Sequence, residues 1–176
     1  RRDGERAAAR GADYNLTGSG TPPRRSAERV TPNYFTTLRT RPMLGRDFTH
    51  EEAVAKAPVA VLAHGFWLRQ FGGRANAIGA SVQLNGQPFT IIGVMPEDFQ
   101  RGSRTELFTP IDYADNKQNH GAHNMQVYGR LKGGVTIEQA RSELAAIAKR
   151  LEAQYPNTNT GWSTLVTPMF DYAVGN

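Results

Sequence analysis

The dipeptide Asn85-Gly86 constrains the fold of this chain more than any other feature of its sequence. Two segments with strand-like patterning, residues 81–84 and 87–94, flank it. Asn and Gly accept the positive φ angles that both central positions of a tight hairpin turn require, so the sequence predicts a two-residue β-hairpin. The chain must therefore contain an antiparallel pair of strands, whose second arm ends at Pro96.

A long helix is the second strong prediction. Thr136 and Gln139 have the spacing of a capping box, and Pro156 marks the end of the helix. Between them an apolar stripe recurs at helical spacing: Ile137, Ala140, Leu144, Ile147, Ala148, Leu151 and Tyr155. Such a stripe predicts that a helix over residues 136–155 packs on strands.

The remaining elements are shorter. The end of a helix is expected within residues 5–11. A second helix is expected to begin at Thr31-Pro32, and a third to cover residues 64–71 and end at Gly72. Further strands are expected near residues 13–17, 26–30, 58–63, 106–111, 125–131 and 162–167. This order predicts an α+β fold with a mostly antiparallel or mixed sheet, and it argues against a doubly wound fold.

The charge of the chain is unevenly distributed. The net charge is +5, but residues 1–46 contain ten arginines and four acidic residues, while the other 130 residues are almost neutral. The basicity therefore belongs to an N-terminal stretch and not to a folded face. This distribution argues against nucleic-acid binding, although a high pI would ordinarily suggest it.

Several classes of protein are excluded by residues that are missing. The 176 residues contain no cysteine, so disulfides, thiolate zinc sites and cysteine nucleophiles are impossible. No apolar run approaches the roughly 18–20 residues that span a bilayer. Because the chain begins with Arg1 and has no signal peptide, we expect it to be a soluble piece of a longer protein, with about 20 apolar residues flanking each end.

A metal site is conceivable only in the polar segment 112–124. His120 and His123 lie three residues apart there, with Asp112 and Asp115 nearby. The spacing matches no closed zinc pattern, so a solvated loop is the preferred interpretation. His64 stands where a strand becomes a helix, without a nucleophile or acid beside it, and a capping or packing role is expected.

No catalytic motif is present. Nucleophile elbows, Ser-x-x-Lys, His-Glu-x-x-His and phosphate-binding glycine loops are all missing. The adjacent acids Glu51-Glu52 and Glu97-Asp98 are interpreted as solvated. The aromatic residues Phe66, Trp67 and Phe71, near Arg69 and Arg74, have helical spacing and are assigned to the core and not to a base-stacking platform. We therefore expect no catalytic, cofactor-binding or metal-binding residue, and a role in binding, assembly or force transmission.

Several blocks of residues carry a resemblance to a known family. They are Val30-Thr31-Pro32-Asn33-Tyr34-Phe35, residues 41–48, residues 59–67, Phe71-Gly72-Gly73, Ile78-Gly79, residues 84–96 and Asp98-Phe99. In order and spacing they resemble the MacB-like periplasmic core domain of bacterial ABC transporter permeases of the FtsX/MacB type. The likeness covers residues 13–170. Within the family, the sequence most resembles the large permeases of acidobacterial type that have no fused ATPase.

The resemblance implies an extracytoplasmic domain between the first two membrane helices of an inner-membrane permease. It implies two lobes, one of residues 1–46 plus 120–176 and one of residues 47–119. The resemblance also implies a non-catalytic role without cofactors, in which ATP hydrolysis on a separate cytoplasmic ATPase moves the membrane helices. Two permease halves would then push a periplasmic substrate or signal to a periplasmic or outer-membrane partner. The alternative is a free periplasmic ligand- or metal-binding domain that uses His120, His123 and Asp115.

Overall fold

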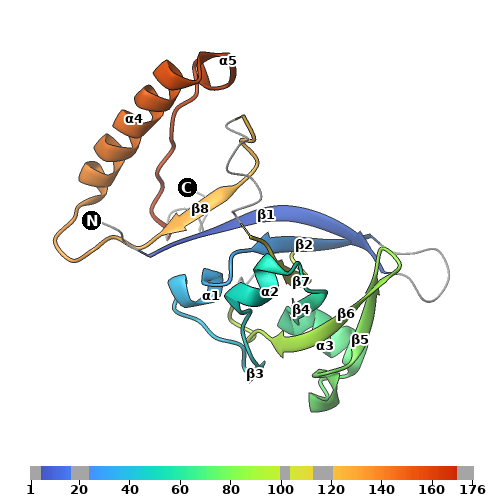
Figure 1. Cartoon of the computed structure of the whole chain (residues 1–176). Coiled ribbons are helices and arrows are strands. Elements are labelled where there is room, and N and C mark those ends of the chain that lie inside the picture. The colour runs from blue at the N-terminus through green and yellow to red at the C-terminus, as the bar shows by residue number, and fades with distance from the viewer. Residues whose placement is uncertain (1–4, 17–23, 100–103, 113–120, 170–176) are drawn as a thin grey trace. The chain divides into compact units, whose positions relative to one another are not determined.

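The structure is a computed structural model that describes residues 5–16, 24–99, 104–112 and 121–169, and the predicted α+β class is confirmed (Figure 1). The described residues form two compact units. The sheet unit comprises residues 6–16, 24–99, 104–112 and 124–129, and the helical unit comprises residues 5, 121–123 and 130–169. These bounds differ from those of the expected lobes, because the first two strands join the same sheet as the hairpin. The lobe division itself stays a prediction.

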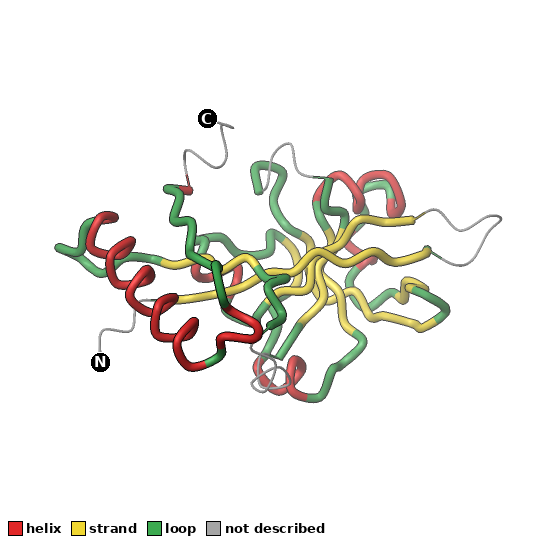
Figure 2. Tube along the Cα trace, turned by 90° about the horizontal axis from the view of Figure 1, so that it is seen from above, coloured by secondary structure: helices red, strands yellow, loops and turns green. Residues whose placement is uncertain are grey.

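The sheet unit contains eight described strands (Figure 2). They are β1 (Arg6–Asn15), β2 (Arg24–Val30), β3 (Leu44–Gly45), β4 (Val59–Leu62), β5 (Ser81–Leu84), β6 (Gln87–Val94), β7 (Leu107–Pro110) and β8 (Gln126–Gly129). Their order is β3-β6-β4-β7-β2-β1-β8, and β5 pairs with β6 outside this path. The pairs β2–β7 and β4–β6 are parallel and the others antiparallel, so the sheet is mixed as predicted.

Short helices connect these strands, and the longest helix lies in the other unit. The sheet unit has α1 (Tyr34–Thr37), α2 (His50–Val54), α3 (His64–Phe71) and the 3-10 turn η1 (Ala75–Ala77). The helical unit has α4 (Ile137–Gln154) and α5 (Pro156–Asn159). The prediction for residues 64–71 is confirmed, and Gly72 ends α3 in the left-handed conformation.

The hairpin is present as predicted, and its tip is bound to β1. Asn85 and Gly86 both have positive φ, at 52° and 78°. The Asn85 side chain accepts a hydrogen bond from the Asn15 amide at 2.8 Å, and the Asn85 amide donates to the Asn15 carbonyl at 2.9 Å. A bridge between Leu16 and Leu84 extends this contact. The turn is thus held by the long strand β1 as well as by its own arms.

Two apolar cores cover the two faces of the sheet. Along β4 and β7, Val61 and Phe108 belong to one core while their neighbours Leu62 and Leu107 belong to the other. This alternation follows from the opposite directions of successive side chains in a strand. The first core is rich in aromatic rings, and the second is built around α3. With both faces filled, bending the sheet would disturb close packing on each side.

Two glycines allow β3 to approach β6 closely. Gly45 has a φ of 72°, and a Cβ built on it would lie 2.1 Å from the Ile92 carbonyl oxygen. A Cβ on Gly93, its partner in the register, would lie 2.6 Å from the Arg46 carbonyl oxygen. A side chain fits at neither position without moving backbone.

The long helix forms where the sequence predicts it. Both hydrogen bonds of the capping box between Thr136 and Gln139 are present. However, no residue of α4 is buried, and Leu144 and Leu151 are each 37% exposed. The packing on strands that the apolar stripe predicted is not found within the helical unit, because none of that unit's described residues forms a strand.

Several local predictions were wrong. The end of a helix expected within residues 5–11 is not found, because residues 6–11 belong to β1. Ala7 and Ala9 are buried within the sheet unit, and tertiary packing there outweighs the high helix propensity of alanine. The Thr31 hydroxyl accepts from the Ala8 amide, so Asn33, and not Thr31, precedes the first turn of α1. Residues 162–167 form no strand.

Candidate functional sites

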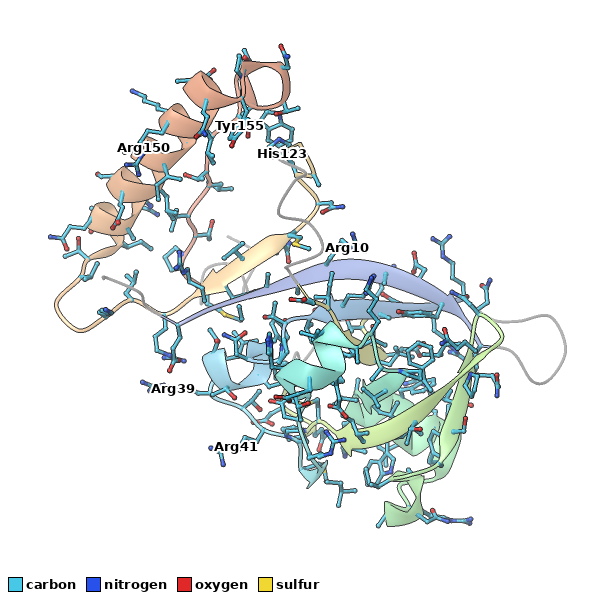
Figure 3. All side chains as sticks on the ribbon, in the orientation of Figure 1. Arg10, Arg39, Arg41, His123, Arg150 and Tyr155 are labelled. Carbon is cyan, nitrogen blue, oxygen red and sulfur yellow. The ribbon has the colours of Figure 1, made fainter. Side chains whose placement is uncertain are left out.

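The histidine segment is only partly described. His120 and Asp115 lie outside the described residues, and Asp112 has an interaction of its own. The ring of His123 stacks on Trp162 at 3.7 Å between centroids, and its Nε2 lies 3.0 Å from the Thr158 carbonyl oxygen (Figure 3). Among the described residues no three potential ligands form a metal cluster. Within this part of the chain, His123 holds two segments of the helical unit together.

His64 occupies the first turn of α3, as expected from its place after β4. Its ring centroid lies 5.4 Å from that of Trp67, with the planes tilted by 55°. Phe66 and Trp67 are buried in the second core, and Phe71 packs against it, so the assignment of these aromatic residues to the core is confirmed. The indole of Trp67 donates to the Arg74 carbonyl at 3.0 Å. These rings are therefore not available as a platform for nucleobases.

The adjacent acids have structural roles or face solvent. Glu52 and Thr49 form a capping box at the start of α2, which the sequence analysis overlooked although the Thr-x-x-Glu spacing is visible. Glu52 also accepts hydrogen bonds from the Arg46 guanidinium, which holds the pKa of this carboxyl below its usual range. Glu97 and Asp98 are exposed in the turn after β6. No pair is placed for shared acid–base chemistry.

One carboxyl has a strongly shifted pKa. Burial raises the pKa of Asp47 to about 6, opposed in part by the hydrogen bond that its side chain accepts from the Phe48 amide. Asp47 follows the close contact between β3 and β6, and Phe48 beside it is buried in the first core. The position is thus explained by the fold, and a shifted pKa here does not by itself indicate catalysis.

A partly buried ion-pair cluster joins β2, α3 and the residue that precedes β7. The Glu106 carboxylate accepts from Arg25 at 3.3 Å and also from Arg69. The Arg25 guanidinium lies 5.6 Å from the centre of the Phe66 ring. Because Phe66, Arg69 and Glu106 are 41 to 81 positions from Arg25 in sequence, no local pattern could have identified the cluster. Its chemistry is that of a cross-link between elements, not of a reactive group.

Taken together, these arrangements describe a mixed sheet with an apolar core on each face, in which the described polar clusters connect elements of the fold. Among the described residues no helix has the length and apolar character needed to cross a membrane. The profile of the family described as "MacB-like periplasmic core domain" matches residues 3–147. The chain belongs to this family.

Relatives with known names agree with that assignment. In two strains of Pseudomonas syringae, pv. syringae B728a and pv. tomato DC3000, the "Probable syringafactin export ATP-binding/permease protein SyfD" is similar to this chain. The first is 28% identical over 91 residues (50% of this chain) and the second 26% over 121 residues (67%). The chain spans only 14% and 18% of the length of these relatives.

Solved structures show the same fold. The periplasmic region of MacB from Actinobacillus actinomycetemcomitans matches with a TM-score of 0.66 and 18% identity, over 88% of this chain and 68% of that one. The extracellular domain of the noncanonic ABC-type transporter YknZ from Gram-positive bacteria matches with a TM-score of 0.64 and 18% identity, over 88% and 79%. The resemblance that the sequence blocks indicated is confirmed.

Proposed function

We propose that this chain is a non-catalytic extracytoplasmic domain of a bacterial ABC transporter permease that couples ATP-driven motion of membrane helices to export or signalling. Its partners would be the membrane helices of its own permease, a second permease half and a separate cytoplasmic ATPase. A periplasmic or outer-membrane protein would receive the signal or the substrate. The family assignment supports this proposal, and so do the names of the Pseudomonas relatives, which describe them as probable export proteins.

The observation that carries the proposal is the way in which β1 is held. Residues 6–9 of β1 pair with β8, residues 9–15 pair with β2, and the hairpin tip binds its far end at Asn15. A force applied along β1 from residue 5 would load many backbone hydrogen bonds at once, in shear. The filled cores on both faces resist bending. A domain built in this way passes on a displacement without absorbing it.

The same contacts favour a mechanical role over a catalytic one. Two described carboxylates already have structural partners. Glu52 caps α2, and Glu106 forms ion pairs with two arginines. Of the candidate metal ligands, His123 is stacked and hydrogen-bonded. Within the part of the segment that the structure describes, residues 112 and 121–124, no observation favours a metal site.

The experiment loosens the proposed connection without unfolding the domain. A Gly-Ser-Gly-Ser insertion between Glu5 and Arg6 adds slack before β1. A spin label on Gln70→Cys, an exposed position in a chain without native cysteine, reports the distance between two copies in the full-length permease with its ATPase. Pulsed electron resonance then compares the nucleotide-free and ATP-trapped states. As a control, the same insertion is made between the exposed Glu97 and Asp98.

We expect ATP to shift the distance between copies in the unmodified permease and in the control, and to leave it unchanged with the insertion before β1. Circular dichroism should show that all three proteins are folded. A shift that survives the insertion before β1, or no shift in the unmodified permease, would refute the coupling role.

A further inference from the structure

The dipeptide Asn85-Gly86, which forms the hairpin turn, is also a chemically labile pair of residues. It occurs once in the sequence. Asparagine is thermolabile because the next backbone amide can attack its side chain, and glycine, which has no side chain, shields that amide least. Both residues are exposed, and a Cβ built on Gly86 would meet no described atom within 4 Å. Burial therefore gives this pair no protection.

The reaction at such a pair is deamidation through a succinimide ring. The amide nitrogen of Gly86 attacks Cγ of Asn85 and forms a new C–N bond. The C–N bond of the side-chain amide breaks, and ammonia leaves with the proton of the Gly86 amide. Water then adds to one of the two ring carbonyls and opens the ring. One carbonyl gives aspartate, and the other gives isoaspartate, in which the backbone runs through Cγ.

The conformation of the turn opposes this attack. The φ of Asn85 is 52°, in the left-handed region. In that region ψ lies at roughly +30° to +60°. Ring closure requires Cβ of Asn85 and the nitrogen of Gly86 to be nearly eclipsed about the Cα–C bond, whereas such a ψ puts them on nearly opposite sides of it. The nitrogen therefore reaches Cγ only after the turn changes its conformation.

The contact with β1 holds the turn in this conformation (Figure 1). Oδ1 of Asn85 accepts from the Asn15 amide at 2.8 Å, and the Asn85 amide donates to the Asn15 carbonyl at 2.9 Å. Beside these bonds Leu16 and Leu84 form a bridge, and Leu84 is buried in the second core. Both hydrogen bonds must break before the turn and the side chain of Asn85 are free to rearrange.

We infer that Asn85 is a site of spontaneous deamidation that the fold holds back, and that the reaction proceeds only when the hairpin tip leaves β1. The rate is then set by the small fraction of molecules in which the tip is detached. Each of the two hydrogen bonds lowers this fraction by a factor of about three to ten, so together they slow the reaction about ten- to a hundredfold.

The isoaspartate product removes the contact that delayed its formation. Isoaspartate adds one carbon to the backbone between residues 85 and 86, and a two-residue turn has no slack to take it up. The pairing of Leu84 with Gln87 and the two bonds to Asn15 cannot both be kept, so the tip stays detached. The modification does not depend on the proposed coupling role, although it acts on a contact that this role uses.

The test measures the rate of deamidation in the 176-residue chain, incubated in mildly alkaline buffer. Peptide mapping by mass spectrometry detects the conversion of the amide to an acid, and chromatography separates aspartate from isoaspartate. A synthetic peptide of residues 81–90 in the same buffer gives the rate without the fold, because an isolated hairpin is marginally stable at best. We expect Asn85 to react about ten- to a hundredfold more slowly in the folded chain than in the peptide.

Two variants at Asn15 test whether the contact with β1 is the cause. Asn15→Pro removes the amide hydrogen that binds Oδ1 of Asn85, and it should raise the rate about three- to tenfold. That amide is directed to the hairpin and not to β2, so proline removes no bond between β1 and β2. Asn15→Ala changes an exposed side chain and keeps the amide, so its rate should equal that of the unmodified chain. The amide spectrum of each variant shows whether it is folded.

A second measurement needs no variant. Urea at concentrations below the unfolding transition detaches the tip in a larger fraction of molecules. Deamidation of Asn85 and hydrogen exchange of the Asn15 amide should therefore accelerate in parallel.

Three results would overturn the inference. One is an equal rate of deamidation in the folded chain and in the peptide. The second is an equal rate in folded Asn15→Pro and Asn15→Ala. The third is a rate of deamidation that stays constant in urea while hydrogen exchange of the Asn15 amide accelerates.

Discussion

The close contact between β3 and β6 gives a sharp prediction about Gly93. In Gly93→Ala the new methyl group would lie 2.6 Å from the Arg46 carbonyl oxygen and 3.3 Å from Cβ of Pro42. Ordinary contact begins near 3.4 Å, so the two backbones must separate by about 0.8 Å. The chain offers a matched control in Gly11, also within a strand and without positive φ, where an added Cβ meets nothing within 4 Å.

The size of the effect follows from what the separation disturbs. The Arg46 amide donates to the Ile92 carbonyl at 2.8 Å, and the Met43 amide donates to the Val94 carbonyl at 2.8 Å. Losing one or two such bonds costs about 0.5–1.5 kcal/mol each, and overpacking costs about 1–3 kcal/mol. Gly93→Ala should therefore destabilise the sheet unit by about 2–4 kcal/mol. Gly11→Ala should be neutral or stabilising by about 0.5 kcal/mol, because alanine loses less backbone entropy.

Urea unfolding followed by Trp67 fluorescence measures this difference. A Trp162→Phe background removes the tryptophan of the helical unit, so that only the sheet unit is observed. With a typical slope of about 2 kcal/mol per molar urea, the midpoint of Gly93→Ala should fall by about 1–2 M. If Gly93→Ala and Gly11→Ala had equal midpoints, the close contact between β3 and β6 would be wrong.

Three further predictions concern a pH effect, a helix cap and the hairpin tip. Since the pKa of Asp47 is raised to about 6, its contribution to stability is full below about pH 4 and is lost as the pH rises through 6. At pH 4 the variant Asp47→Asn should be as stable as the unmodified chain. At pH 7.5 it should be more stable by about 1 kcal/mol, a value that allows for solvent screening. Equal urea midpoints of the two proteins at pH 7.5 would contradict this. Thr136→Ala removes the cap of α4 and should lower the free energy of unfolding of this helix by about 1 kcal/mol, as measured by circular dichroism. An unchanged melting curve would mean that the capping box is not formed in solution. Asn85→Gly keeps the turn but removes the bond to the Asn15 amide, so the Asn15 amide should exchange with solvent roughly tenfold faster, and unchanged exchange would argue against docking of the tip.

Local patterns in the sequence account for a large part of this fold. The Asn85-Gly86 hairpin, the capping box at Thr136 and the stop at Gly72 depend on residues within a few positions of one another, and all three are present. Alanines 7–9 favour a helix by their local propensity, but they lie in a strand because their burial in the sheet unit depends on distant strands. The sequence also could not show that no strand among the described residues of the helical unit covers α4.

The functional features show the same limit. The sequence correctly placed Phe66 and Trp67 in the core, because helical spacing is a local signal. The Glu106 cluster brings together residues from distant segments, which only the sheet order β4-β7-β2 makes neighbours. By contrast, the capping box of Thr49 and Glu52 was visible in the sequence and was missed.

The proposed coupling role requires the sheet unit to move as a rigid body during the ATP cycle. Met43 next to β3 and Val127 in β8 are exposed and lie at opposite ends of the strand order, so spin labels there span the sheet. In the full-length permease with its ATPase, the Met43–Val127 distance within one copy should be the same in the nucleotide-free and ATP-trapped states, while the distance between copies changes. A Met43–Val127 distance that shifts or broadens with ATP, while the copies stay at a fixed separation, would contradict the account.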